Sequence, residues 1–135
     1  MSQANGKAKG GRPSKYTEEL TTVMCDRLAS GQSLREICRD PAMPCDLTVR
    51  RWLLDGKHPA FCAHYAQARE LQADQIFEEL CEIADDGRND WMERNVRGKV
   101  ELVCDHENVN RSRLRVDARK WILARMSPKR YGELL

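Results

Sequence analysis

The side chains best suited to chemistry are cations and a hydroxyl around one short predicted helix, residues 47–54. Val49, Trp52 and Leu53 recur there at helical spacing, so this apolar edge should face inward. The opposite edge then presents groups that can donate hydrogen bonds to base edges and to the phosphates of double-stranded DNA. The candidate DNA contacts on and around this helix are Arg12, Lys15, Thr48, Arg50, Arg51 and Lys57.

Two alternative interpretations of these candidates involve no DNA binding. The helix could belong to a trihelical protein-binding module with a solvated basic face. Arg12, within Gly11-Arg12-Pro13 and after Lys7 and Lys9, suits an arm that reads the minor groove, but a solvated tail explains it almost as well.

Catalytic and metal chemistry find no support in the sequence. Cys62-x-His64, with Cys38 and Cys45 upstream, matches no zinc-ligand spacing and has no recognised nucleophile context. The acid pairs Glu78-Glu79 and Asp85-Asp86 suit a solvated helical face, and no phosphate-binding GxxxxGK[ST] sequence occurs. We therefore expect no enzyme activity, no catalytic residues, no metal site and no cofactor.

The charges are strongly segregated along the 135 residues, although the whole chain carries only +2. Residues 1–60 carry a net +3, residues 61–95 a net −6 and residues 96–135 a net +5. Such blocks suggest different partners for different segments. No run of apolar residues is long enough for a secretory signal or a membrane span, so we expect no membrane partner and reduced cysteines.

The elements that must position the basic helix read as a helix-turn-helix domain over residues 12–57. Thr17 can cap a first helix that Gly31 ends, and Ser33 with Glu36 forms a capping-box pattern for a second. Asp46 is the expected N-cap of the third helix. Residues 1–11 are small, polar and Gly-rich, and they read as a flexible basic arm.

Residues 58–132 read as a helical oligomerisation domain. An acidic helix from Pro59 to Asp86 and a basic helix from about Glu107 to Met126 carry opposite charge and suit an antiparallel hairpin. The fold class is therefore all-α. The inserted connection 87–106 is compatible with a short β-hairpin in 90–104, because Val96 to Val100 suits a tight turn.

The basic stripe on the last helix has two readings. Arg111, Arg115 and Arg119 could face DNA or bridge subunits, or they could pair with the acidic helix, which we favour. The candidate oligomerisation residues of both helices are Phe77, Leu80, Ile83, Leu114, Arg115, Trp121 and Ile122.

Several strings together resemble one family. They are Gly11-Arg12-Pro13-Ser14-Lys15-Tyr16, Met43-Pro44 with Arg51-Trp52-Leu53, Ile76 to Asp85, Ser112 to Trp121, and Pro128-Lys129-Arg130-Tyr131-Gly132. Their order is similar to that in the small terminase subunits of Sf6-like tailed bacteriophages. The resemblance spans nearly the whole chain from Gly11 to Gly132.

The resemblance implies a ring of about eight to eleven copies, with the long helices around a central channel and the N-terminal domains outside. It implies recognition of viral double-stranded DNA for packaging, and recruitment and regulation of a large subunit that supplies the ATPase and nuclease. It places the protein in the host cell cytoplasm and not in the mature virion. Relatives usually continue beyond Tyr131-Gly132 into a tail that helps to line the pore or bind the large subunit, whereas this sequence ends with residues 133–135.

Two other function classes stay open at this point. A dimeric helix-turn-helix transcription regulator of phage or prophage origin would need paired half-sites about one helical turn apart. An interaction scaffold would use the basic head to bind an acidic protein.

Overall fold

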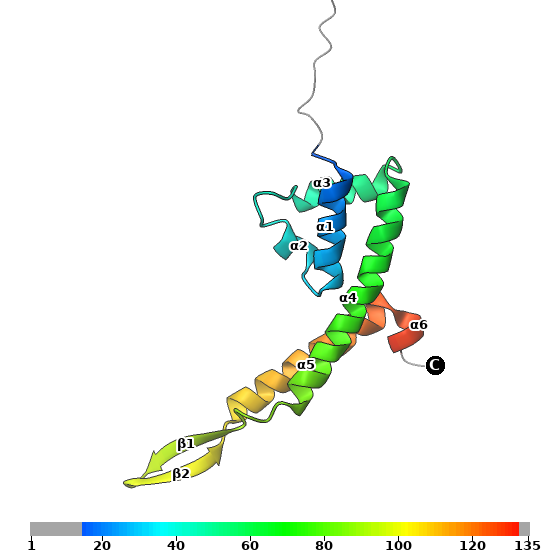
Figure 1. Ribbon diagram of the computed structural model, residues 1–135. Helices are drawn as coiled ribbons and strands as arrows, with labels where there is room; N and C mark the ends of the chain where they lie inside the picture. Colours follow the sequence, from blue (N-terminus) through cyan, green and yellow to red (C-terminus); the bar gives the residue numbers. More distant parts are fainter. Residues whose placement is uncertain (1–14, 133–135) are drawn as a thin grey trace, which may run out of the picture.

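The computed structural model describes residues 15–132. In chain order the elements are α1 (Glu18–Ala29), α2 (Leu34–Ile37), α3 (Asp46–Leu54), α4 (Pro59–Asp85), β1 (Trp91–Val96), β2 (Lys99–Cys104), α5 (His106–Met126) and α6 (Pro128–Tyr131). The molecule is elongated, with a compact head of α1 to α3 at one end and the β-hairpin at the other (Figure 1). This arrangement confirms the predicted fold class: a helical chain with a helix-turn-helix, a long helical hairpin and a short β-hairpin.

The head is built around one apolar core. Met24 and Leu28 on α1, Ile37 on α2 and Val49 on α3 are completely buried. Phe61 on α4 joins the same cluster, followed by Tyr65 and Ala68 one and two turns later. The core therefore extends past residue 57, because the first half of α4 closes the head that the sequence placed in residues 12–57.

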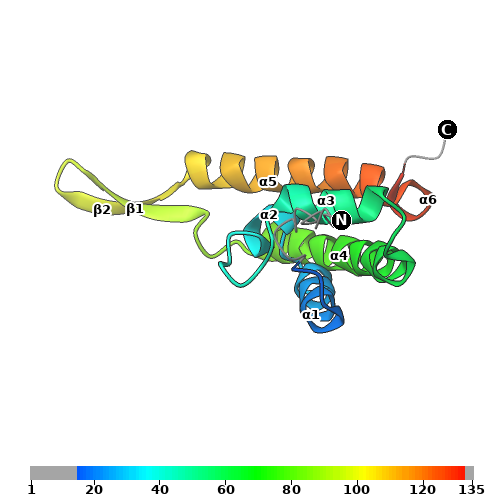
Figure 2. The same ribbon diagram turned by 90° about the horizontal axis from the view of Figure 1, so that it is seen from above.

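The second half of α4 packs against α5, and the two helices run side by side with the β-hairpin beyond them (Figure 2). Ile83 on α4 and Leu123 on α5 are buried at this contact. α5 ends at Met126, as predicted, two residues before Pro128. The same proline then begins α6, a short turn that the sequence analysis missed, since proline needs no N–H at a first helical position.

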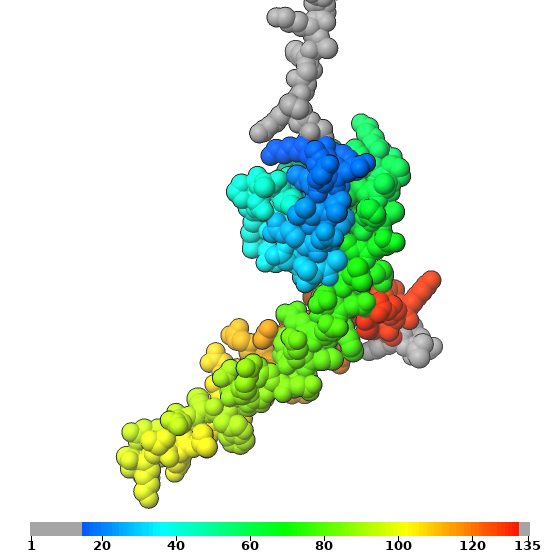
Figure 3. Space-filling view, in the orientation of Figure 1, coloured from blue at the N-terminus to red at the C-terminus, as the bar shows by residue number. Residues whose placement is uncertain are grey.

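The β-hairpin has a two-residue turn at Arg97 and Gly98, with Val96 paired to Lys99 and Trp91 to Cys104. Both turn residues have positive φ, 54° and 78°, as a type I′ turn requires. The β-hairpin extends away from the helices and protrudes from the molecule (Figure 3).

Candidate nucleic-acid interface

Polar contacts hold the helix-turn-helix in shape before any partner binds. Thr17 Oγ1 accepts a hydrogen bond from the Leu20 N–H, and Ser33 Oγ accepts one from the Glu36 N–H at 3.1 Å, so both predicted caps are confirmed. Arg27 on α1 donates to Gln32 at 2.7 Å and to Asp40 at 2.9 Å. Arg27 thus connects α1 to the chain on both sides of α2.

The same contacts stabilise the charged form of Asp40. A hydrogen bond from the Ala42 N–H, and then the Arg27 guanidinium, lower the pKa of the Asp40 carboxyl below its usual value. Asp40 therefore stays ionised near neutral pH and keeps its ion pair with Arg27. The turn that leads to α3 is fixed by this pair.

The start of α3 corrects one prediction. The N-cap is Cys45, whose backbone is extended, and Asp46 is the first helical residue. Asp46 Oδ1 accepts the Leu47 N–H at 3.0 Å, and its other oxygen lies 4.0 Å from Arg50 Nε. An acid in the first turn is favourable at the positive end of the helix dipole, so Asp46 stabilises α3 from inside the helix.

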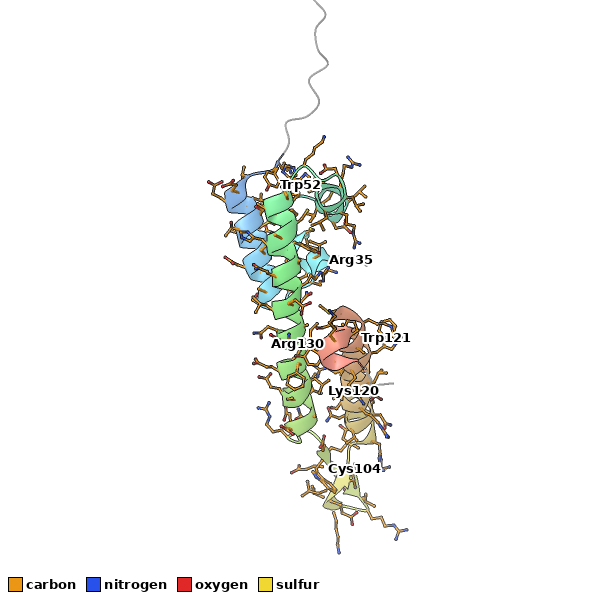
Figure 4. The ribbon with its side chains drawn as sticks, turned by 90° about the vertical axis from the view of Figure 1, so that its right-hand side faces the viewer. Arg35, Trp52, Cys104, Lys120, Trp121 and Arg130 are labelled. Atoms are coloured by element: carbon orange, nitrogen blue, oxygen red, sulfur yellow. The ribbon has the colours of Figure 1, made fainter. Side chains whose placement is uncertain are left out.

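The inward edge of α3 is the predicted one. Val49 is fully buried, Trp52 is nearly so, and Leu53 packs on the same cluster. Tyr16 meets the Trp52 ring edge-on at 5.1 Å. Trp52 lies at the top of the head, near the N-terminal end of α4 (Figure 4).

The outward edge differs in part from the predicted one. Arg50 and Arg51 are exposed together, as expected. Thr48 is half-buried at the side of the helix, with its hydroxyl 3.1 Å from Cys45 Sγ. Hydrogen bonds from the Thr48 hydroxyl, and then from its backbone N–H, lower the pKa of the Cys45 thiol. Leu47 and Leu54, which the sequence analysis passed over, are 62% and 86% exposed on the same face as the two arginines.

Two lysines lie at one end of α3. Lys57 is exposed in the turn between α3 and α4, where its N–H donates to Asp55 at 2.9 Å. The Tyr16 ring stacks on His58 with centroids 3.7 Å apart, which brings the exposed Lys15 beside that turn. Arg12 lies outside the described residues. The head thus brings together Lys15, Arg50, Arg51 and Lys57 around α3, with Thr48 at its edge.

Opposite charges meet inside the helical hairpin. Arg119 on α5 lies 3.0 Å from Glu79 on α4. Arg130 on α6 donates to Asp74 at 2.5 Å, and Tyr131 also donates to this carboxylate. Of the three arginines in the predicted basic stripe, Arg119 pairs with the acidic helix, whereas Arg111 lies 3.9 Å from Glu107 on its own helix and Arg115 is exposed.

Apolar side chains remain uncovered on the outer side of the hairpin. Leu114 is 68% and Trp121 59% exposed, and Phe77 and Ile122 are also exposed. Lys120 and Trp121 lie on the side of α5 away from α4 (Figure 4). Phe77 on α4, Trp121 and Leu123 on α5 and Tyr131 on α6 are among the residues that line a groove of about 860 Å³ formed by these three helices.

Ile83 differs from the other predicted oligomerisation residues because it is buried within the single chain. It is 9% exposed because α5 already covers it, so it supports the hairpin from within. Leu80 is half-buried beside the groove. The other members of the predicted set lie at the surface of a single chain.

Within residues 15–132, no three His, Cys, Asp or Glu side chains are grouped in a way that could hold a metal ion. In the same part of the chain, no helix combines the length and the apolar character needed to cross a membrane.

Comparisons with known proteins agree with this architecture. Among solved structures, two crystal structures of variants of the terminase small subunit gp1 of the bacterial virus sf6 are 43% identical to the chain. They superpose with TM-scores of 0.68 and 0.67 and cover 91% of this chain and 82% of theirs. A curated relative, the uncharacterized protein YffO of Escherichia coli (strain K12), is 31% identical over 103 residues, 71% of this chain and 73% of that protein.

The sequence pattern of one family matches residues 16–135, which leaves only the first fifteen residues outside it. That family is described as Bacteriophage Sf6, terminase small subunit-like. The match contains both the head with its exposed arginines and the helical hairpin. The chain belongs to the family of terminase small subunits that resemble the one of bacteriophage Sf6.

Proposed function

We propose that the protein is the DNA-recognition component of a phage genome-packaging motor. Several copies assemble through the helical hairpin, and each copy presents one helix-turn-helix head to viral double-stranded DNA. The observation that carries this proposal is the exposed Arg50–Arg51 pair on α3 in a chain that belongs to the terminase small-subunit family.

The head supports DNA binding through the arrangement of its cations. In a helix-turn-helix, the last helix enters the major groove and its N-terminal side chains meet the bases. Arg50 and Arg51 lie in the middle of α3 on its exposed face, while Lys15 and Lys57 near its C-terminal end suit the phosphates. Thr48 contributes from the side, and Arg12 reaches the minor groove from the arm.

The hairpin supports self-assembly through what it leaves uncovered. Leu114, Trp121, Phe77 and Ile122 form exposed apolar surface, and α4 carries exposed acids such as Glu78 and Glu82 opposite the exposed Arg115 of α5. The acidic side of one copy and the basic side of the next form a head-to-tail contact, which closes into a ring when the rotation allows it. A ring of about eight to eleven copies would raise the avidity of weak heads without new contacts.

The remaining parts of the proposal follow from family membership. The ring recruits and regulates the large terminase subunit, which supplies the ATPase and nuclease, and itself does no catalysis. It works in the host cell cytoplasm. Residues 12–57 are the DNA-binding domain, whose core the first half of α4 completes, and residues 58–132 are the assembly domain.

The test is the affinity of the full chain for double-stranded DNA, measured by fluorescence anisotropy at low salt. Arg50→Ala with Arg51→Ala should weaken binding at least about tenfold, because each arginine contact is worth about 1–3 kcal/mol. The matched control, Arg94→Ala with Lys99→Ala, removes the same charge from the β-hairpin and should bind like the wild type. Equal affinity of all three proteins would reject α3 as the recognition helix.

A further inference from the structure

The outward face of α3 carries two leucines that the packing of the head does not use. Leu47, Arg50, Arg51 and Leu54 follow one another at positions i, i+3, i+4 and i+7, so they form one stripe. The inward stripe of Val49 and Trp52 is the one that fills the core. Leu47 and Leu54 are therefore available to a partner of the head.

Leu47 has the position of a base-reading residue. It is the second residue of α3, at the N-terminal end that enters the groove in helix-turn-helix proteins. Its side chain is exposed, and its backbone N–H is already satisfied by Asp46 Oδ1. An apolar side chain at this place offers a surface for the one apolar group on a base edge, the C5-methyl of thymine.

Arg50, one turn further along, complements Leu47. Its Nε lies 4.0 Å from Asp46, so the carboxylate in the first turn of α3 also lies beside the guanidinium. A guanidinium directed into the major groove donates to the N7 and O6 of guanine. The side chains of residues i and i+3 are about 5–6 Å apart, which spans one or two base steps.

The stripe suits DNA better than a protein partner. A protein that covered both leucines would also have to desolvate Arg50 and Arg51 between them, and burying charge without a matching partner is costly. Along DNA, the same arginines can reach guanine edges or phosphates while Leu47, at the N-terminal end of the stripe, meets a methyl group.

We propose that Leu47 reads sequence by packing on a thymine methyl, within two base pairs of a guanine that Arg50 contacts. This inference rests on the proposed DNA-binding function and adds a specificity residue to it.

The test begins with the full-length protein and a pool of random-sequence DNA duplexes, from which bound sequences are selected. The selected duplex is then prepared with thymine, and again with 2′-deoxyuridine in place of the thymine nearest the enriched guanine. Loss of one buried methyl should weaken wild-type binding about fourfold. Leu47→Ala should bind the two duplexes equally, whereas the matched variant Leu54→Ala should discriminate like the wild type.

The four affinities form a double-mutant cycle between side chain and methyl, so any general effect of deoxyuridine on the duplex cancels. Leu47 is exposed, and an unchanged melting temperature will confirm that Leu47→Ala is folded. A selected site without thymine beside guanine, equal wild-type binding to both duplexes, or discrimination retained by Leu47→Ala would overturn the inference. If DNA binding depends on Arg50 and Arg51 but is the same with thymine and deoxyuridine, only the inference about Leu47 is overturned. If the wild type does not bind DNA, the proposed function is overturned as well.

Discussion

At the scale of single residues, the joint between the head and α4 depends on one buried amide. Gln72 on α4 is 4% exposed. Its Nε2 donates to the Gln32 carbonyl at 2.9 Å, and its Oε1 accepts from Arg69 at 2.7 Å. The Gln32 side chain in turn accepts from Arg27, so the amide connects α4 to the turn that precedes α2.

Gln72→Ala should lower the free energy of unfolding by about 1–3 kcal/mol, because it leaves the Gln32 carbonyl without its donor in a buried place, although Arg69 keeps its hydrogen bond to Tyr65. Urea unfolding at fixed protein concentration measures this change. Gln75→Ala, an exposed position on the same helix, is the control and should change stability by less than about 0.5 kcal/mol. Similar stability of both variants would mean that water replaces the amide at this joint.

The attachment of α6 should depend on acid pH. Hydrogen bonds from Arg130, then from Tyr131, hold the pKa of Asp74 below its usual 3.8. A lowered folded-state pKa gives stability that is complete above the ordinary pKa and is lost as the pH falls through the folded-state value. The protection of residues 128–132 against hydrogen exchange, relative to the intrinsic exchange rate at each pH, should therefore be constant above about pH 5 and fall only below the ordinary pKa.

Asp74→Asn is the matching variant, since it keeps the shape and removes the charge. Its residues 128–132 should show low protection against exchange at every pH, without the step on the acid side. A step of the same size in the variant would assign the acid sensitivity to another carboxylate, with Glu70, 3.8 Å from Arg130, as the first to examine.

At the scale of the elements, the β-hairpin depends on its turn. Gly98 has a φ of 78°, and a Cβ at this position would meet no other atom. Arg97 has a φ of 54°, which is unfavourable for a residue with a Cβ because this atom then lies too close to the backbone carbonyl. Arg97→Asn should stabilise the hairpin, since Asn-Gly is the preferred type I′ pair, and Gly98→Val should loosen it.

Hydrogen exchange of residues 91–104 compares the two variants, with Arg94→Ala as a strand control that should exchange like the wild type. Slower exchange in Arg97→Asn and faster exchange in Gly98→Val are the expected results. Unchanged exchange in both variants would show that contacts beyond the turn determine the stability of the hairpin.

The elements that the sequence predicted well are those decided by local contacts. The caps at Thr17 and Ser33 rest on hydrogen bonds to residues three positions ahead, and the turn at Gly98 rests on backbone geometry. The start of α3 was misplaced by one residue, because Asp46 is as favourable inside the first turn as at the cap. The short helix α6 was missed because its attachment depends on Asp74, far away in sequence.

The candidate site shows the same division. Arg50 and Arg51 could be placed outward because Val49 and Trp52 define the opposite face. Leu47 and Leu54 could not, since an apolar residue type indicates a core unless the tertiary packing is known. Ile83 was listed among the candidate oligomerisation residues because the sequence alone does not show that α5 covers it.

At the scale of the whole molecule, a single chain leaves too much apolar surface uncovered for an isolated protein. Apart from Leu47, Leu54 and Val23 on the head, many of the uncovered side chains lie on the helical hairpin and on the protruding β-hairpin, with Leu114, Trp121, Trp91 and Leu102 among the most exposed. Patches of this kind mark association surfaces. We therefore expect the copies to assemble along the helical hairpin, with the heads free to bind DNA.

Leu114→Glu should reduce the native mass of the protein to that of a monomer or small oligomer, because it puts a charge in the middle of the apolar face. Circular dichroism should show the same helix content, since Leu114 is exposed in the single chain. Val23→Glu, which introduces the same charge at an exposed apolar position of the head, should keep the wild-type mass. An unchanged mass in Leu114→Glu would place the interface elsewhere.

The most direct test of the account is the native mass of the purified wild-type chain, measured by native mass spectrometry over a range of protein concentrations. If the chain assembles into a ring through the helical hairpin, we expect one closed assembly of about eight to eleven copies whose size does not grow with concentration. A monomer or a stable dimer at every concentration would contradict it, and a dimer would favour a helix-turn-helix regulator that binds paired half-sites.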